Sequence, residues 1–266
     1  DKSGTCKMDD GNTYYFYATG KVQTSSKAEI ITVDGSGYYF NSDSSVIIPG
    51  DKTKWEKIDG KTYRINKYGK LLTGWRTLGG KTYYTSKKNY YRLENKIGNI
   101  DGDRYLFDKK GVMKTKTWKY KNGVRTYYFG KDGKALKSTA KYVGKYKYFF
   151  DKNGVAQTNL VKYKGLKWVK KHSIKIKENR KNNIVTVYAK DGKKRYTIPV
   201  LNCLCSVGKS STPTPKRTYY TGQIYRWKLL GGGANGPLCW GQYATWMSYR
   251  GYYFHTCTYD VKDIHT

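Results

Sequence analysis

Residues 58–75, IDGKTYRINKYGKLLTGW, and residues 100–115, IDGDRYLFDKKGVMKT, carry one pattern twice. In each copy an Asp-Gly pair precedes a short aromatic run, a second glycine and a threonine four residues after that glycine. Asp-Gly pairs supply the positive φ angles of a tight turn, and the aromatic run alternates as a strand does. Each copy therefore predicts a β-hairpin.

The pattern returns along the first two thirds of the chain. A turn glycine recurs every 20 to 22 residues at Gly60, Gly80, Gly102, Gly123, Gly144 and Gly165, after looser copies at Gly11 and Gly35. One hairpin of about 20 residues cannot bury its apolar face alone, so successive hairpins have to stack into a solenoid. The 29 tyrosines suit such shallow packing, because a tyrosine ring packs while its hydroxyl stays in water.

The charge of the chain is strongly positive. The 52 lysines and arginines against 19 acidic residues give a formal net charge of +33, which attracts polyanions of any kind. Lysine outnumbers arginine, and this suits diffuse attraction better than bidentate recognition of phosphate.

No stretch approaches the ~20 apolar residues that span a bilayer, so we predict no transmembrane segment. Since the sequence begins at Asp1 rather than Met, we expect a mature or shortened product.

The repeat pattern ends after Gly165, and alternating β-branched strands begin near Ile174. We place a boundary there, which gives a repeat domain over residues 1–170 and a second domain over residues 171–266. Residues 185–188 and 196–200 predict a hairpin in the second domain. No amphipathic helix of convincing length occurs, so the predicted fold class is all-β.

The repeats resemble the cell-wall-binding repeats of Gram-positive surface proteins, a superfamily that includes choline-binding and glucan-binding modules. The resemblance covers roughly residues 5–170, with Gly74-Trp75 as the fullest match to the choline-binding motif. In that motif aromatic rings of neighbouring hairpins enclose a quaternary ammonium group. Three interpretations stay open: choline binding, broader attachment to wall polymers, and aromatic side chains that serve only as core. The candidate wall-binding residues are Tyr63, Trp75, Tyr83, Tyr105, Trp118 and Tyr127.

The second half has a characteristic order of features. A hairpin is followed by residues 205–208, a Thr-Pro element at Thr212, a glycine-rich loop at residues 231–236 and a strand that ends in His255-Thr256. This order resembles the opening half of the L,D-transpeptidase (YkuD-type) catalytic domain, which is β-sandwich-like. The resemblance implies transfer of peptidoglycan stem peptides through a cysteine thioester. It also implies that His255 is the base and that the Thr256 carbonyl orients it.

The nucleophile of that family is missing from the sequence. The Ser-His-Gly-Cys motif does not occur before Thr266, and Cys257 matches no family nucleophile, so we expect an incomplete and inactive domain. Five cysteines without CxxC spacing predict neither a disulfide framework nor a zinc site, and burial is expected for most of Cys6, Cys203, Cys205, Cys239 and Cys257. We predict no metal and no cofactor.

The main prediction is a secreted, cell-wall-associated L,D-transpeptidase, which the repeats hold against peptidoglycan and anionic wall polymers or glycans. The alternative is a non-catalytic cell-wall or glycan-binding surface protein whose second half is a scaffold. Nucleic-acid binding through charge is a third possibility, but no motif for specific nucleic-acid recognition accompanies the charge.

Overall fold

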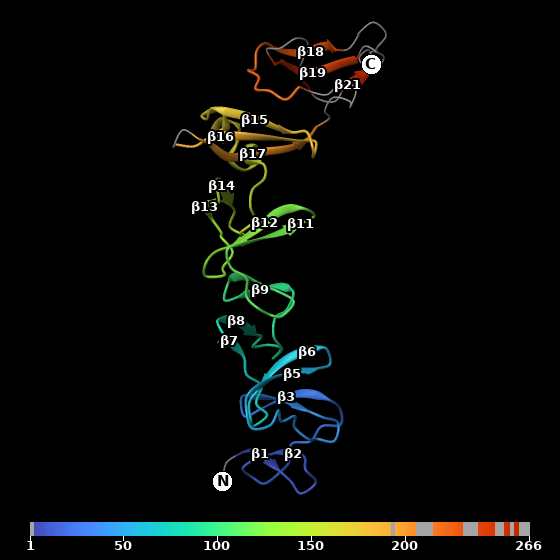
Figure 1. The fold of residues 1–266 in the computed structure, drawn as a ribbon. Coiled ribbons are helices and arrows are strands. Elements are labelled where there is room, and N and C mark those ends of the chain that lie inside the picture. Colours follow the sequence, from blue (N-terminus) through green and yellow to red (C-terminus); the bar gives the residue numbers. More distant parts are fainter. Residues whose placement is uncertain are drawn as a thin grey trace. The chain divides into compact units, whose positions relative to one another are not determined.

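The computed structural model describes residues 3–192, 195–205, 215–230, 239–247, 253–255 and 258–260 (Figure 1). It forms two compact units, Asp1–Leu204 and Cys205–Thr266. The boundary expected between residues 170 and 171 therefore falls inside the first unit.

Most of the first unit consists of antiparallel hairpins, each a two-stranded sheet of its own. Figure 1 draws each labelled pair as two neighbouring arrows. In the described residues there are seven: β1 (Gly4–Lys7) with β2 (Thr13–Phe16), β3 (Glu29–Val33) with β4 (Ser36–Phe40), β5 (Lys54–Ile58) with β6 (Lys61–Ile65), β7 (Gly74–Leu78) with β8 (Lys81–Thr85), β9 (Lys96–Ile100) with β10 (Asp103–Phe107), β11 (Thr117–Lys121) with β12 (Val124–Phe129), and β13 (Thr139–Val143) with β14 (Tyr146–Phe150).

The predicted Asp-Gly and Asn-Gly turns at residues 59–60, 101–102 and 122–123 are confirmed. Ile58 pairs with Lys61, so Asp59 and Gly60 form a two-residue loop, with φ angles of 47° and 74°. Both angles are positive, as a tight hairpin turn with a matching twist requires. The loops at residues 101–102 and 122–123 have the same backbone.

The core lies where the second strand of each hairpin ends. That position holds the most deeply buried side chains of the hairpins. The residue there also forms a β-bridge with a residue six or seven positions later, in the loop that follows the hairpin. Its occupants with at most 1% exposure are Phe40, Ile65, Thr85, Phe107, Phe129 and Phe150.

Backbone hydrogen bonds join each hairpin to the one before it. The Leu71 N–H, in the loop after β6, donates to the Gly37 carbonyl of β4 at 2.8 Å. The equivalent donors along the chain are Val46, Arg92, Met113, Ala135 and Ala156, with N···O distances of 2.7–2.9 Å. Contacts of this kind between neighbouring repeats define a solenoid, as the period of the sequence predicts.

The eighth turn glycine does not form a hairpin. Gly165, with φ of 84°, separates two five-residue helices, α1 (Leu160–Lys164) and α2 (Leu166–Lys170). The Asn159 side chain caps α1 by accepting from the Lys162 N–H at 2.9 Å. The all-β prediction is therefore correct for the hairpins and wrong for residues 160–170, where an asparagine cap selects a helix.

The two helices pack onto a three-stranded antiparallel sheet, which explains the position of the unit boundary. The sheet is formed by β15 (Ile174–Asn179), β16 (Ile184–Lys190) and β17 (Tyr196–Leu204), and β16 with β17 contains the predicted hairpin. Leu160 and Val169 of the helices share one buried cluster with Ala189, Ile198 and Val200 of the sheet. This cluster binds residues beyond 170 to the repeats rather than to the second unit.

The second unit is a small antiparallel sheet. Its central strand β19 (Cys239–Trp246) pairs with β18 (Ile224–Leu230), β20 (Tyr253–Phe254) and β21 (Thr258–Asp260). The expected strand before His255 is present as β20, Tyr253–Phe254, and residues 249–252 of the expected stretch lie outside the described residues.

Candidate functional site

A tryptophan–tyrosine pair recurs between consecutive hairpins. The second residue of a first strand is a tryptophan, and its ring contacts the central tyrosine of the second strand of the next hairpin. The ring centroids lie 5.6 Å apart for Trp55 and Tyr83, 4.8 Å for Trp75 and Tyr105, and 4.9 Å for Trp118 and Tyr148. Such edge-on and tilted contacts are the preferred geometries of aromatic pairs.

The candidate aromatics divide between these pairs and other positions. Trp75, Tyr83, Tyr105 and Trp118 belong to the pairs. Tyr63 instead lies in the core at 6% exposure, beside the rings of Tyr39 and Tyr91, and burial raises its pKa.

Tyr127 lies under a guanidinium group rather than a tryptophan. The guanidinium carbon of Arg104 is 5.2 Å from its ring centroid, and Arg104 Nη1 donates to the Tyr127 hydroxyl at 3.3 Å.

The sequence-based selection missed one partner in each of two pairs, Trp55 and Tyr148. Both could have been found by spacing, since Trp55 precedes Trp75 by one repeat and Tyr148 is the central aromatic of its hairpin. Trp55 follows Lys54, whereas the motif has a glycine before its tryptophan, and for this reason Trp55 was not recognised from the sequence.

The Trp55 pair already contains a cation. The guanidinium carbon of Arg92 lies 4.7 Å from the Trp55 centroid and 5.5 Å from the Tyr83 centroid. Its Nη2 forms a 2.7 Å ion pair with Glu94, and its Nε donates to the same carboxylate at 2.9 Å. Arg64 lies over the same tryptophan at 5.3 Å, and burial, together with the charge of Arg76, lowers the pKa of Arg64.

The other two pairs are also occupied. Arg125 lies 5.7 Å from the Trp118 centroid, and its Nη1 donates to the Tyr148 hydroxyl at 3.4 Å, while burial raises the pKa of Tyr148. Trp75 is enclosed by the rings of Tyr84 and Phe107, so this third pair is part of the core.

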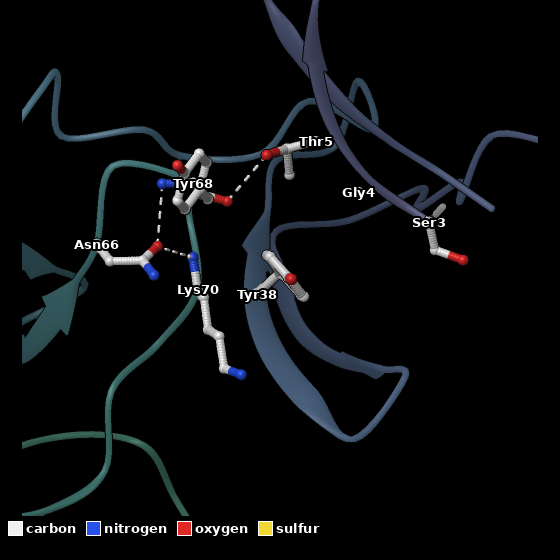
Figure 2. Close-up of a pocket in the computed structure, with 7 residues that line it drawn as sticks. All are labelled: Ser3, Gly4, Thr5, Tyr38, Asn66, Tyr68 and Lys70. Carbon is white, nitrogen blue, oxygen red and sulfur yellow. Dashed lines mark hydrogen bonds between the residues drawn. The ribbon is translucent and has the colours of Figure 1, made fainter. Parts of the chain in front are cut away.

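A separate polar pocket lies between the first hairpin and the loop after β6 (Figure 2). Its volume is about 300 Å³. Thr5 Oγ1 donates to the Tyr68 carbonyl at 3.0 Å, and Asn66 Oδ1 accepts from the N–H groups of Tyr68 and Lys70 at 3.0 and 2.9 Å. The loop is therefore fixed by these hydrogen bonds, while Tyr68 stays 58% exposed. The lining residues are Ser3, Gly4, Thr5, Tyr38, Asn66, Tyr68 and Lys70.

His255, the expected base, is exposed at the end of β20. Its Cβ and Cγ lie 3.1 and 3.3 Å from where a side chain on Gly241 would begin, so it rests directly on β19. Its proposed partner Thr256 lies outside the described residues, as do Cys257, the Thr212 element, the 231–236 loop and His265. The roles assigned to His255 and Thr256 stay predictions.

The structure corrects the expectation for the cysteines. Cys6 and Cys203 are exposed free thiols, and Cys205 is half-buried. Within the described ranges no group of three or more His, Cys, Asp or Glu side chains is arranged to hold a metal ion. No helix in this part of the chain is long and apolar enough to cross a membrane.

Comparison with known proteins identifies relatives of the repeats. The chain is 33% identical over 131 residues to Glucosyltransferase-I of Streptococcus downei, a match of 48% of this chain and 8% of the relative. It is 30% identical over 140 residues to Glucosyltransferase-S of Streptococcus mutans serotype c, covering 52% and 9%. The chain thus spans less than a tenth of the length of these relatives. No protein-family model matches it.

A solved structure is also similar. Choline binding protein F from Streptococcus pneumoniae is 29% identical, with 59% of this chain and 48% of that chain covered and a TM-score of 0.40.

The sequence relatives support the repeat prediction: about half of this chain is similar to segments of two streptococcal glucosyltransferases. They also confirm the predicted location, which is extracellular and associated with the cell wall.

The prediction of an L,D-transpeptidase is wrong. The two sequence relatives named above are glucosyltransferases, and neither is an L,D-transpeptidase. The error has a physical reason, because a hairpin, a Thr-Pro turn and a strand ending in histidine are features that many β-rich chains share.

Proposed function

We propose that this chain is a non-catalytic binding protein of the bacterial surface, which attaches to wall polymers or glycans through its hairpin repeats. The observation that carries the proposal is the recurrence of one hairpin along residues 4–156, each linked to the hairpin before it by an equivalent backbone hydrogen bond. A repeat presents equivalent surfaces at regular intervals along one molecule, which suits a polymeric ligand with repeating units.

The sequence relatives support this assignment, since a shared segment of 131 residues links the chain to a glucosyltransferase, an enzyme that by its name transfers glucosyl groups. The charge of +33 supports it as well, because it attracts a wall polymer that carries phosphate or carboxylate groups.

Within this function we place a sugar contact in the pocket of Figure 2. An exposed ring at Tyr68, hydroxyls at Ser3 and Thr5, and the Lys70 side chain line it. Sugars present apolar ring faces edged by hydroxyls, so a pocket lined by two tyrosines, Tyr38 and Tyr68, and several polar groups fits a single sugar residue. Its volume of about 300 Å³ lies at the lower end of small-ligand sites.

The proposal is tested by co-sedimentation of the full chain with purified Gram-positive sacculi, with sacculi stripped of anionic polymers, and with an insoluble glucan. We expect the protein in at least one pellet at physiological salt, with excess duplex DNA unable to displace it. Absence of the protein from all three pellets would refute the proposal, and complete displacement by DNA would show that charge alone accounts for the binding.

A further inference from the structure

Arg92 occupies a position where the other hairpins place an apolar side chain. In the repeat register it corresponds to Val46, Leu71, Met113, Ala135 and Ala156, since each of these donates its backbone N–H to the preceding hairpin and bridges the end of its own. Arg92 makes both connections, to Thr62 at 2.7 Å and to Thr85. The backbone is therefore standard, and only the side chain departs from the pattern.

The Arg92 side chain is half-buried, less completely than Val46 and Leu71 at the equivalent positions. Its exposure is 14%, and its Nε, Cδ and Cγ atoms lie 2.5–3.0 Å from where a Cβ on Gly111 would be. Met113 packs under Gly133 in the same way one hairpin later. A charged group in such a place requires compensation, because burial of an unpaired charge is costly.

The compensation comes from two aromatic rings and one carboxylate. Trp55 and Tyr83 contact the guanidinium group at 4.7 and 5.5 Å, and Glu94 accepts a hydrogen bond from its Nε and forms an ion pair with its Nη2. Two aromatic faces with a nearby carboxylate form an environment that favours a cation, including a quaternary ammonium group.

We propose that Arg92 is a specificity-determining residue: its guanidinium permanently fills the cation site between Trp55 and Tyr83, and thereby excludes quaternary ammonium ligands such as choline. The inference rests on the proposed function in one respect: if the repeats bind a wall polymer or glycan, Arg92 restricts that ligand to groups without a quaternary ammonium. The geometry itself does not depend on wall binding.

The other two pairs support the same exclusion. Arg125 contacts Trp118 and Tyr148, so a second pair is filled by a guanidinium group of the chain. The third pair is closed by Phe107 and Tyr84 around Trp75. Each tryptophan–tyrosine pair in the described hairpins is thus occupied from within.

The test is a choline chloride titration of the ¹⁵N-labelled full chain, followed by NMR through the indole N–H cross-peak of Trp55, which the Trp55→Phe variant assigns. We expect no saturable shift in the unaltered protein. In Arg92→Ala the emptied site keeps Glu94 as a counterion, so the Trp55 cross-peak shifts saturably. The double variant Arg92→Ala/Glu94→Gln binds choline about tenfold more weakly, as loss of one charge-assisted contact predicts.

Matched variants separate occupancy from charge. Arg226, on β18 in the second unit, is exposed, so Arg226→Ala removes one positive charge away from the site. In this variant we expect choline to cause no saturable shift of the Trp55 cross-peak. Arg92→Met fills the site with an apolar side chain, as Met113 does one hairpin later, and also stays closed to choline. Saturable binding to Trp55 in the unaltered protein, or no response in folded Arg92→Ala, overturns the proposal.

A second site keeps the test decisive if Arg92→Ala does not fold. Arg125 is exposed, so Arg125→Ala should leave the fold intact and open the Trp118–Tyr148 pair to choline. No response at Trp118 in that folded variant contradicts the inference. Co-sedimentation with sacculi is measured in parallel: if it fails while the choline results hold, the proposed function falls and the role of Arg92 remains.

Discussion

The hydroxyl of Tyr39 donates a hydrogen bond of 2.5 Å to Asp59 Oδ2, in the turn of the next hairpin. One repeat earlier, the Tyr15 hydroxyl donates to Asp34 Oδ2 at 2.9 Å. Both tyrosines are buried and both aspartates have positive φ. The turn residue that shapes one hairpin therefore also fastens it to the hairpin before.

These contacts predict a loss of stability in alkali. The hydrogen bond to Asp59 and burial raise the pKa of Tyr39 to about 12, and burial with the Asp34 contact raises that of Tyr15 to about 12. The unfolded chain loses these protons near its ordinary pKa of 10.0, whereas the folded chain keeps them. The two tyrosine contacts therefore contribute their whole stabilisation below about pH 10. Above that pH the free energy of unfolding falls, and it continues to fall as the pH rises toward 12.

Urea unfolding followed by circular dichroism at several pH values between 8 and about 12 measures this loss. Tyr39→Phe lowers stability by about 1–3 kcal/mol at neutral pH, since a hydrogen bond to a carboxylate is removed, and flattens the alkaline decline. Tyr68→Phe, at a 58% exposed ring, should behave as the unaltered protein does. An equal decline in Tyr39→Phe and the unaltered protein would refute the assignment.

Truncation at the end of a second strand should be costly. Phe107 is 1% exposed and belongs to a cluster with Tyr84, Leu93 and Ile100. Phe107→Ala should reduce the free energy of unfolding by about 3–5 kcal/mol, through lost burial and the cavity left behind. Ile65 fills the equivalent position two hairpins earlier, so Phe107→Ile serves as a control with a much smaller loss. Thermal and urea unfolding distinguish the two variants.

The two glycines of one repeat should differ in their response to alanine. Gly102 and Gly111 have φ of 80° and 73°, but an added Cβ meets nothing within 4 Å at Gly102 and Arg92 Nε at 2.5 Å at Gly111. Gly102→Ala should cost roughly 1–2 kcal/mol from backbone strain alone. Gly111→Ala should cost more and shift the Trp55 indole cross-peak by displacing Arg92. Equal losses, with Trp55 unmoved, would contradict the packing of Arg92 under Gly111.

The sugar contact proposed for the Figure 2 pocket predicts a selective loss of binding. Tyr68→Ala removes an exposed ring and should change stability by no more than about 0.5 kcal/mol. Affinity for the glucan or wall polymer should fall about three- to tenfold, as expected for loss of one ring contact. Tyr220→Ala, at a 78% exposed tyrosine in the second unit, is the control. Equal affinities for both variants would place the sugar contact elsewhere.

The hairpins were predictable because their signals are local. Asp59-Gly60 and Asn122-Gly123 are residue pairs that favour the positive φ angles they adopt, so each turn and both flanking strands follow from a few adjacent residues. Gly165 shows the limit of such reasoning. Its positive φ joins two helices instead of two strands, and the deciding signal is the Asn159 cap six residues earlier.

The candidate site was less predictable because its contacts are distant in sequence. Trp55 and Arg92 are separated by more than one full repeat, and only the stacking of the hairpins brings them together. In the second half, a histidine at the end of a strand suggested an active site. The order of motifs around that histidine has no fixed spacing, so it does not distinguish one β-rich fold from another. The repeats do have a fixed spacing, which is their period.

The hydrogen bonds from each loop to the hairpin before it, such as Leu71 to Gly37, have a mechanical consequence. Because each hairpin is tied mainly to its neighbours, a pull on the chain is carried through these links in series. A strained hairpin can detach and release its roughly 20 residues while the others hold. An attached surface protein built in this way would lengthen stepwise under fluid shear rather than break free at once.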